Sequence, residues 1–421
     1  MGLSQLRMAH IAYALSMPDR PFAALFANRP FIRFWFARLI SVTASQMLMV
    51  AVAWHMYDIT SSAWDLGLVG LFQFVPALVF TLPGGHAADR FHRGRIFALC
   101  LLLQAGIAVT LLVATHSGFA TRGLILGISV LLGVARAFQM PAQQSLTPLL
   151  VPPEFLQRAV ALSSSGMQVA IICGPALGGA LYTSGPIAVY ATSAALLLLS
   201  MALAWAIRYR HTTSSLMVNW NTVLAGFTFV WERKVLLGAT SLDLFAVLLG
   251  GATALLPIYA RDILHTGPIG LGVLRAAPAA GALLMSVALL RWPLRRHIGH
   301  RLLLAVAIFG LATVVFGVSA NFWLSGLALV VTGAADSVSV VTRMTLVQME
   351  TPDDMRGRVS AVNSIFIGAS NQLGEFESGA TAAAFGAIGS VVAGGVGTML
   401  IAASWFKLFP ALANRDRMEK A

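Results

Sequence analysis

Twelve apolar segments, each long enough to cross a lipid bilayer as a helix, limit the folds that this chain can adopt. A helix needs about 20 mainly apolar residues to span the hydrocarbon core. Charged residues make up only 10% of the chain and apolar residues 58%, which is too little polar surface for a water-soluble protein of this length. We therefore predict an all-α membrane protein. Its twelve transmembrane helices are Phe31–Tyr57, Ala63–Leu82, Ile96–Ala114, Gly123–Pro141, Ala159–Tyr182, Ile187–Ile207, Leu236–Tyr259, Leu271–Leu290, Leu302–Val318, Phe322–Val341, Val359–Phe385 and Ile388–Leu408.

The formal charge of +12 is unevenly distributed along the chain. Such a charge can indicate nucleic-acid binding, but membrane proteins also gather Lys and Arg in their cytoplasmic loops. Alternate connections hold little beyond Arg122 and Arg261. The asymmetry predicts a multi-pass protein of the bacterial inner membrane with both termini in the cytoplasm and no nucleic-acid partner. The basic side includes Arg90, Arg93, Arg95, Arg158, Arg208, Arg210, Arg233, Lys234, Arg291, Arg295, Arg296, Arg301, Arg356 and Arg358.

The chain also repeats itself. A displacement of 200 residues lays Gly133–Ser164 on Gly333–Ser364, and one of 205 lays Leu66-Gly67 on Leu271-Gly272. Parallel repeats of this kind predict two pseudo-symmetric six-helix bundles, over residues 30–207 and 235–410. A polar linker, 208–234, separates them and contains a possible amphipathic helix at Trp220–Arg233. Residues 1–29 and 411–421 are predicted to be cytoplasmic segments.

The most specific motif follows the second span and reads Gly85-His-Ala-Ala-Asp89-Arg90-Phe-His-Arg93-Gly94-Arg95. We expect Gly85 to permit close helix approach, Gly94 to allow a tight turn, and the arginines to extend to the cytoplasmic surface. An ordinary basic loop is the alternative interpretation.

This motif resembles the loop signature of the major facilitator superfamily, over about residues 30–410. The second copy has Leu294 where Asp89 stands. The resemblance implies that Asp89 is a gating residue. It would dock near Arg356 and Arg358 at the start of span eleven and close the cytoplasmic side.

Two further segments resemble exporters within that superfamily. Span five contains Gly174-Pro175-Ala176-Leu177-Gly178-Gly179, which is similar to the antiporter motif of drug exporters, although a packing kink is the alternative. Segments 357–361 and 370–379, together with Leu255-Leu256-Pro257, resemble the branch that includes macrolide efflux proteins and enterobactin exporters. The resemblance favours proton-driven export.

Charged residues inside spans are costly and are therefore candidates for function. Arg136 and Asp336 coincide in the repeat, and the resemblance places their helices along a central cavity, where they could pair, flank substrate or form a structural salt bridge. Arg38 and Arg343 lie near cytoplasmic ends, where we expect them to extend to the headgroups, and Arg275 is a weaker candidate. The proton-coupling candidates are Asp243, Asp336, Glu375 and Glu377, of which the two glutamates could instead lie at the external headgroups. The substrate-cavity candidates are Arg136, Gln46, Gln139, Asn371 and Gln372.

We predict a secondary active transporter that works as a monomer by alternating access and exports a small amphipathic molecule, such as a drug or a siderophore. A proton gradient would supply the energy, with no cofactor and no metal. An enzyme is disfavoured, because the nine histidines show no zinc spacing and no nucleophile elbow or Walker loop is present. A facilitator or importer of a small metabolite and a non-transporting receptor remain alternatives.

Overall fold

Helices form the framework of the chain. The computed structural model describes residues 25–209, 220–294, 296–352 and 355–416. Most of the predicted 1–29 segment, part of the linker and the end of the tail therefore lie outside the described residues. The first six long helices are α3 (Arg29–Thr60), α4 (Ala63–Arg90), α5 (Arg93–His116), α6 (Arg122–Leu150), α7 (Pro153–Tyr182) and α8 (Pro186–Trp205).

The second half begins with a short helix and continues with long ones. Among the described residues, eleven helices are long and apolar enough to cross a membrane. The last, α15, bends back at Gly386, whose φ of 78° suits glycine, so α15 supplies two spans and the total is twelve. The elements are α9 (Trp220–Glu232), α10 (Lys234–Gly250), η1 (Ala252–Leu255), α11 (Leu256–Ile258), η2 (Tyr259–Ile263), α12 (Gly267–Arg291), α13 (Ile298–Val318), α14 (Phe322–Glu350), α15 (Arg356–Leu408) and α16 (Pro410–Ala413).

Span seven is not the continuous helix that we predicted over Leu236–Tyr259. Its α-helical part ends at Gly250, and Gly251 takes a ψ of 60°, which is not helical. A 3₁₀ turn, a short α-helical turn and a π turn follow, from Ala252 to Ile263. Two adjacent glycines and Pro257, which has no N–H to donate, explain why the regular helix stops there.

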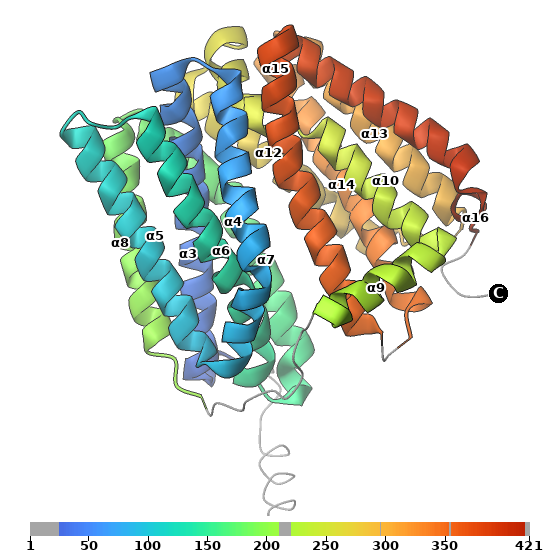
Figure 1. The fold of residues 1–421 in the computed structure, drawn as a ribbon, viewed down its shortest axis with the longest axis horizontal. Coiled ribbons are helices and arrows are strands. Elements are labelled where there is room, and N and C mark those ends of the chain that lie inside the picture. The colour runs from blue at the N-terminus through green and yellow to red at the C-terminus, as the bar shows by residue number, and fades with distance from the viewer. Residues whose placement is uncertain (1–24, 210–219, 295, 353–354, 417–421) are drawn as a thin grey trace, which may run out of the picture.

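The long helices form two bundles that touch through two pairs of helices (Figure 1). Within the first bundle α3 packs on α7 and α8, α4 on α6, and α5 on α8. Within the second bundle α10 and α13 pack on α15, and α12 on α14. Between the bundles α4 packs on α15 and α7 on α12, which pairs span two with eleven and span five with eight. Exchanging the halves turns one pair into the other, as expected for pseudo-twofold symmetry.

Equivalent glycines make equivalent contacts in the two halves. A β-carbon at Gly133 of α6 would collide with the carbonyl oxygen of Gln73 on α4. One at Gly333 of α14 would collide with the carbonyl oxygen of Pro278 on α12. The two displacements found in the sequence, 200 and 205 residues, relate these partners. The predicted repeat is therefore present in the helix packing.

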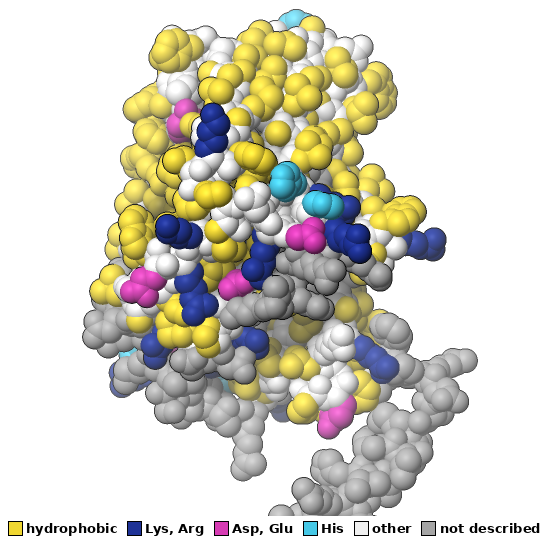
Figure 2. Space-filling view, turned by 90° about the vertical axis from the view of Figure 1, so that its right-hand side faces the viewer, with side chains coloured by type: hydrophobic (Ala, Val, Ile, Leu, Met, Phe, Trp, Pro, Cys, Tyr) yellow, Lys and Arg dark blue, Asp and Glu magenta, His cyan; other side chains and the backbone are white. Residues whose placement is uncertain are grey.

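Charged side chains gather toward one end of the molecule. On the face shown in Figure 2, hydrophobic side chains cover most of the upper part and charged groups cluster in the lower half. The basic end is the end of the molecule at which α3 begins and α15 finishes. The opposite end is the one that contains the connection between α3 and α4. The predicted helix at Trp220–Arg233 exists as α9, which packs on α15 with Gly226 against the carbonyl of Arg358.

Candidate functional site

Glycines bring the two bundles into backbone contact near the opposite end. A β-carbon at Gly272 of α12 would lie 2.5 Å from the carbonyl oxygen of Pro175 on α7, and one at Gly179 would lie 3.0 Å from the Cα of Gly272. On the other side of the interface, a β-carbon at Gly67 of α4 would lie 3.1 Å from the Cα of Gly379 on α15. These two seams leave no room for side chains.

The antiporter-like motif of span five lies at this interface. Gly174 packs against Gln46 of α3, and Gly178 packs against Met47 of the same helix. Gly179 faces α12 instead, as described above. One face of the motif, with Gly174 and Gly178, therefore packs on α3, and another face, with Gly179, packs on α12 of the second bundle. Gln46, a predicted cavity residue, contacts Gly174 at this helix-packing surface.

Polar groups link the bundles beyond the glycine seams. The Tyr57 hydroxyl donates a hydrogen bond to the Asp262 carboxylate. Arg261 lies 3.4 Å from Asp58, and its guanidinium carbon lies 5.2 Å from the centre of the Tyr57 ring. These four residues join the end of α3 to η2, and we call them the latch.

A charged cluster draws its members from three helices of the two bundles. Arg275 of α12 interacts electrostatically with Glu375 of α15 and with Arg136 of α6. The β-carbon of Glu375 would lie 3.0 Å from a β-carbon at Gly70 of α4, so this glycine leaves space for the glutamate. The 205-residue displacement makes Gly70 the counterpart of Arg275. Arg275, a weaker candidate in the sequence, is thus a member of the cluster.

A second charged group lies within the second bundle. The carboxylate of Asp243 on α10 is 3.1 Å from the guanidinium of Arg343 on α14, and Arg343 donates to the amide oxygen of Asn363 on α15 at 3.0 Å. Asp336 interacts electrostatically with Asp243 and Arg343, and the two aspartates line one small pocket. The expectation that Arg343 extends to the headgroups is wrong, because its side chain is only 1% exposed. The described residues include no ion pair between Arg136 and Asp336.

The remaining predicted polar residues are distributed among different environments. Gln139 of α6 accepts a hydrogen bond from Gln104 of α5, which in turn accepts one from Ser45 of α3 at 2.9 Å. Gln139 therefore bridges helices of the first bundle. On α15, Gln372 is buried, Asn371 is exposed and donates to the carbonyl of Ile367 at 2.8 Å, and Glu377 is half-buried.

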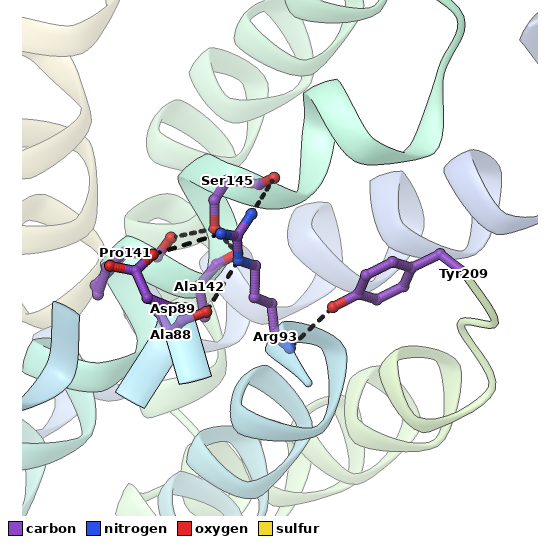
Figure 3. Close-up of polar contacts among 7 residues, drawn as sticks. All are labelled: Ala88, Asp89, Arg93, Pro141, Ala142, Ser145 and Tyr209. Atoms are coloured by element: carbon purple, nitrogen blue, oxygen red, sulfur yellow. Dashed lines mark hydrogen bonds and ion pairs between the residues drawn. The ribbon is translucent and has the colours of Figure 1, made fainter. Parts of the chain in front are cut away.

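The loop motif is organised around Arg93 (Figure 3). This buried guanidinium donates to the carbonyls of Ala88 at 2.9 Å and Ser145 at 3.5 Å, and it lies 3.4 Å from Asp89. Its backbone N–H donates to the hydroxyl of Tyr209 at 2.9 Å. Arg93 thus joins α4, α5, α6 and the chain after α8.

Three expectations about this motif are wrong. Arg93 is buried, whereas Arg90 and Arg95 are exposed as predicted. A β-carbon at Gly85 would meet nothing within 4 Å, and it is Gly84 that packs against the carbonyl of Ala137 on α6. Gly94 lies in the first turn of α5 rather than in a loop, where it makes room for the rings of Tyr209 and His92. Neighbouring residues on a helix point about 100° apart, so an error of one position changes the face.

Two six-helix bundles, joined through α4–α15 and α7–α12 with charges at their interface, define a membrane transporter of the major facilitator type, which is not an enzyme. The chain matches the family model described as transmembrane secretion effector over residues 20–420. It belongs to this family of the major facilitator superfamily.

Relatives and solved structures agree with this assignment. The chain is 29% identical over 381 residues to the enterobactin exporter EntS of Citrobacter koseri, covering 86% of this chain and 84% of the exporter. It is 25% identical over 269 residues to macrolide efflux protein A of Streptococcus pyogenes, covering 60% and 64%. The predicted exporter branch is therefore confirmed.

The fold of this chain resembles that of a bacterial homologue of the human lysosomal transporter Spinster, solved in an inward-facing, unoccupied conformation. The TM-score is 0.74 at 16% identity, and the match covers 94% of this chain and 99% of the homologue. The nucleoside transporter NupG gives a TM-score of 0.65 at 14% identity, with coverage of 91% and 98%.

Proposed function

We propose that this protein exports a small amphipathic molecule across the bacterial inner membrane in exchange for protons. The observation that carries the proposal is the cluster of Arg136, Arg275 and Glu375, which unites both bundles in a fold whose curated relatives include exporters. Charges at bilayer depth are retained where they bind ions or substrate. In this proposal the basic end faces the cytoplasm, following the positive-inside rule.

The proposed conformation is inward-facing. The glycine seams and the latch hold the bundles together near the opposite end. Asp89, which the superfamily resemblance assigns to a gate with the start of α15, pairs with Arg93 of its own bundle. Both observations favour a state in which the basic end is the open one, and rocking of one bundle against the other would then expose the cluster to the external side.

Glu375 is the proposed site of exchange between proton and substrate. Its ionised carboxylate accepts hydrogen bonds from hydroxyl or amine groups of the substrate, while Arg136 and Arg275 meet carbonyl, phenolate or carboxylate oxygens. Protonation removes the charge of Glu375, so a proton arriving from outside displaces the substrate there. Loss of that proton to the cytoplasm restores the site. Asp336, beside the Asp243–Arg343 pair, is the second candidate for carrying a proton.

The test is transport into proteoliposomes with an imposed pH gradient, using a catecholate siderophore and a macrolide as separate probes. Wild-type protein should accumulate at least one probe against its concentration gradient and carry protons in the opposite direction. Glu375→Gln should lose this accumulation but keep exchange without a gradient. Glu377→Gln, the same change two residues along α15, is the matched control. It should retain coupling, because Glu377 is half-buried and does not interact with the arginines of the cluster.

Three results would contradict the proposal. Wild-type flux that ignores the pH gradient would favour the facilitator alternative. Equal coupling in Glu375→Gln and in the wild type would remove Glu375 from the mechanism. Binding of either probe without any translocation would instead favour the receptor alternative.

A further inference from the structure

A pocket of about 640 Å³ lies at the basic end of the first bundle, away from the interface between the bundles. It is bounded by the start of α3, the start of α5 and the end of α8. The residues that line it are Arg33, His92, Gly94, Arg95, Ala204, Trp205, Ala206, Ile207, Arg208 and Tyr209. His92, Gly94 and Arg95 also belong to the loop motif, but the residues of the proposed transport site, Arg136, Arg275, Glu375 and Asp336, lie outside this set. The pocket therefore needs its own explanation.

The charge of the pocket is positive. Three guanidinium groups line it, from Arg33, Arg95 and Arg208, and no carboxylate of a described residue does. Within the described part of the chain, none of the three forms an ion pair with Asp or Glu. Arg33 donates to the carbonyl of Ala206 at 2.9 Å, which fixes its guanidinium at the wall between α3 and α8. Such an arrangement suits an anion with several acceptor oxygens.

The surroundings place the pocket at the edge of the membrane. Trp205 ends α8 with 58% of its surface exposed, and Phe91, just before α5, is 59% exposed. Exposed aromatic rings at helix ends typically lie among lipid headgroups. Ala204, Trp205 and Ile207 give the pocket an apolar wall beside its basic groups. A soluble anion would gain nothing from that wall, whereas a lipid has an acyl region to cover it.

We propose that this pocket binds the phosphate headgroup of an anionic phospholipid. Basic pockets between transmembrane helices on the cytoplasmic side are suited to such headgroups. Three guanidinium groups can hold two phosphates, so cardiolipin, with two phosphates, binds more tightly than phosphatidylglycerol. The bound lipid joins the ends of α3, α5 and α8, and through Gly94 and Tyr209 it lies beside the loop motif around Arg93.

The experiment is a lipid titration of the purified full-length protein in detergent, read by native mass spectrometry and by the apparent melting temperature. The ligands are cardiolipin, phosphatidylglycerol, phosphatidylethanolamine and inorganic pyrophosphate. The variant is Arg95→Gln with Arg208→Gln. The matched control is Arg291→Gln with Arg301→Gln, which removes two exposed arginines from the basic end of the second bundle.

Wild-type protein and the control should bind cardiolipin with equal affinity and gain equal thermal stability. The Arg95→Gln/Arg208→Gln variant should bind it roughly 10- to 30-fold more weakly, since each basic group near a lipid phosphate contributes to affinity. A variant with lysine at both positions keeps the charge and should retain part of the binding. That result would show that the glutamine variant loses binding through lost charge and not through misfolding.

Equal cardiolipin binding by the wild type, the pocket variant and the control would overturn the proposal. Equal loss in the pocket variant and the control would also overturn it, because the effect would then come from overall charge. Pyrophosphate binding as tight as that of cardiolipin, at the same residues, would overturn the lipid assignment and indicate a soluble phosphate ligand.

Discussion

The carboxylate of Asp243 and the guanidinium of Arg343 lie 3.1 Å apart and are 7% and 1% exposed, so each charge depends on the other. They connect α10 to α14, and the bond from Arg343 to Asn363 extends the connection to α15. Burying two charges costs several kcal/mol in desolvation, which their attraction roughly offsets. Removing one partner should therefore destabilise the protein more than removing both.

Arg343→Gln should lower the free energy of unfolding by about 3–5 kcal/mol, because the charge of Asp243 is left buried without its counter-ion. The double variant Asp243→Asn/Arg343→Gln should recover most of that loss. Melting temperatures in detergent would measure both, with the exposed Arg301→Gln as the control. A double variant that is no more stable than Arg343→Gln would argue against this account.

Gly272→Ala should reduce transport at least tenfold, because its β-carbon would lie 2.5 Å from the carbonyl of Pro175 and would force the bundles apart. Gly127→Ala adds the same methyl group on α6, where nothing lies within 4 Å, and should transport normally. Transport assays at matched expression would compare them. Normal transport by Gly272→Ala would mean that this seam does not need to close.

Arg93→Gln and Asp89→Asn should separate stability from gating. Arg93→Gln removes donors from two backbone carbonyls and should cost about 1–3 kcal/mol of stability. Asp89→Asn removes only a partly exposed pair at 3.4 Å, so its effect on stability should stay below about 1 kcal/mol. Because the superfamily resemblance makes Asp89 a gate residue, its loss should still favour the inward-facing state and reduce transport. Unchanged transport at normal expression would remove the gating role.

The latch should contribute modestly to closure of the opposite end. Arg261 and Asp58 are 38% and 41% exposed, and exposed pairs contribute at most about 1 kcal/mol, so Arg261→Gln should shift the ratio of the two states by about fivefold or less. Distances between spin labels at Ile59→Cys and Ile269→Cys would report the shift, once Cys100 and Cys173 are replaced. Added salt should mimic the substitution in the wild type, and a salt-independent distribution would count against an ionic latch.

The fold could be predicted from the sequence because lipid demands long apolar helices and because the repeat survives in paired positions such as Gly133 and Gly333. The interruption at Gly251 could not, since glycine and proline also stand within spans that stay helical, such as Pro175 and Gly178 of α7. Gly386 shows the converse: the two predicted spans on either side of it are correctly separated, and α15 changes direction between them.

The site was harder to predict for a geometric reason. Position along a span gives depth but not the direction in which a side chain points. Arg343 lies at a depth where a side chain could reach the headgroups. Its side chain points instead to Asp243, which is on a helix a hundred residues earlier in the chain. Arg275 likewise interacts electrostatically with Glu375, which lies on a helix a hundred residues further along the chain. Both partners become visible only once the helices are packed.

The seating of α9 on α15 has a practical consequence for dividing this protein. Gly226 lies against the carbonyl of Arg358, and Phe227 stacks on Phe366 with its ring 6.3 Å away. Helix α9 is thus a structural part of the C-terminal half. Two fragments made by cutting before Trp220 keep this packing within the C-terminal fragment. Cutting after Glu232 would leave α9 on the N-terminal fragment, separated from the helix that it packs on.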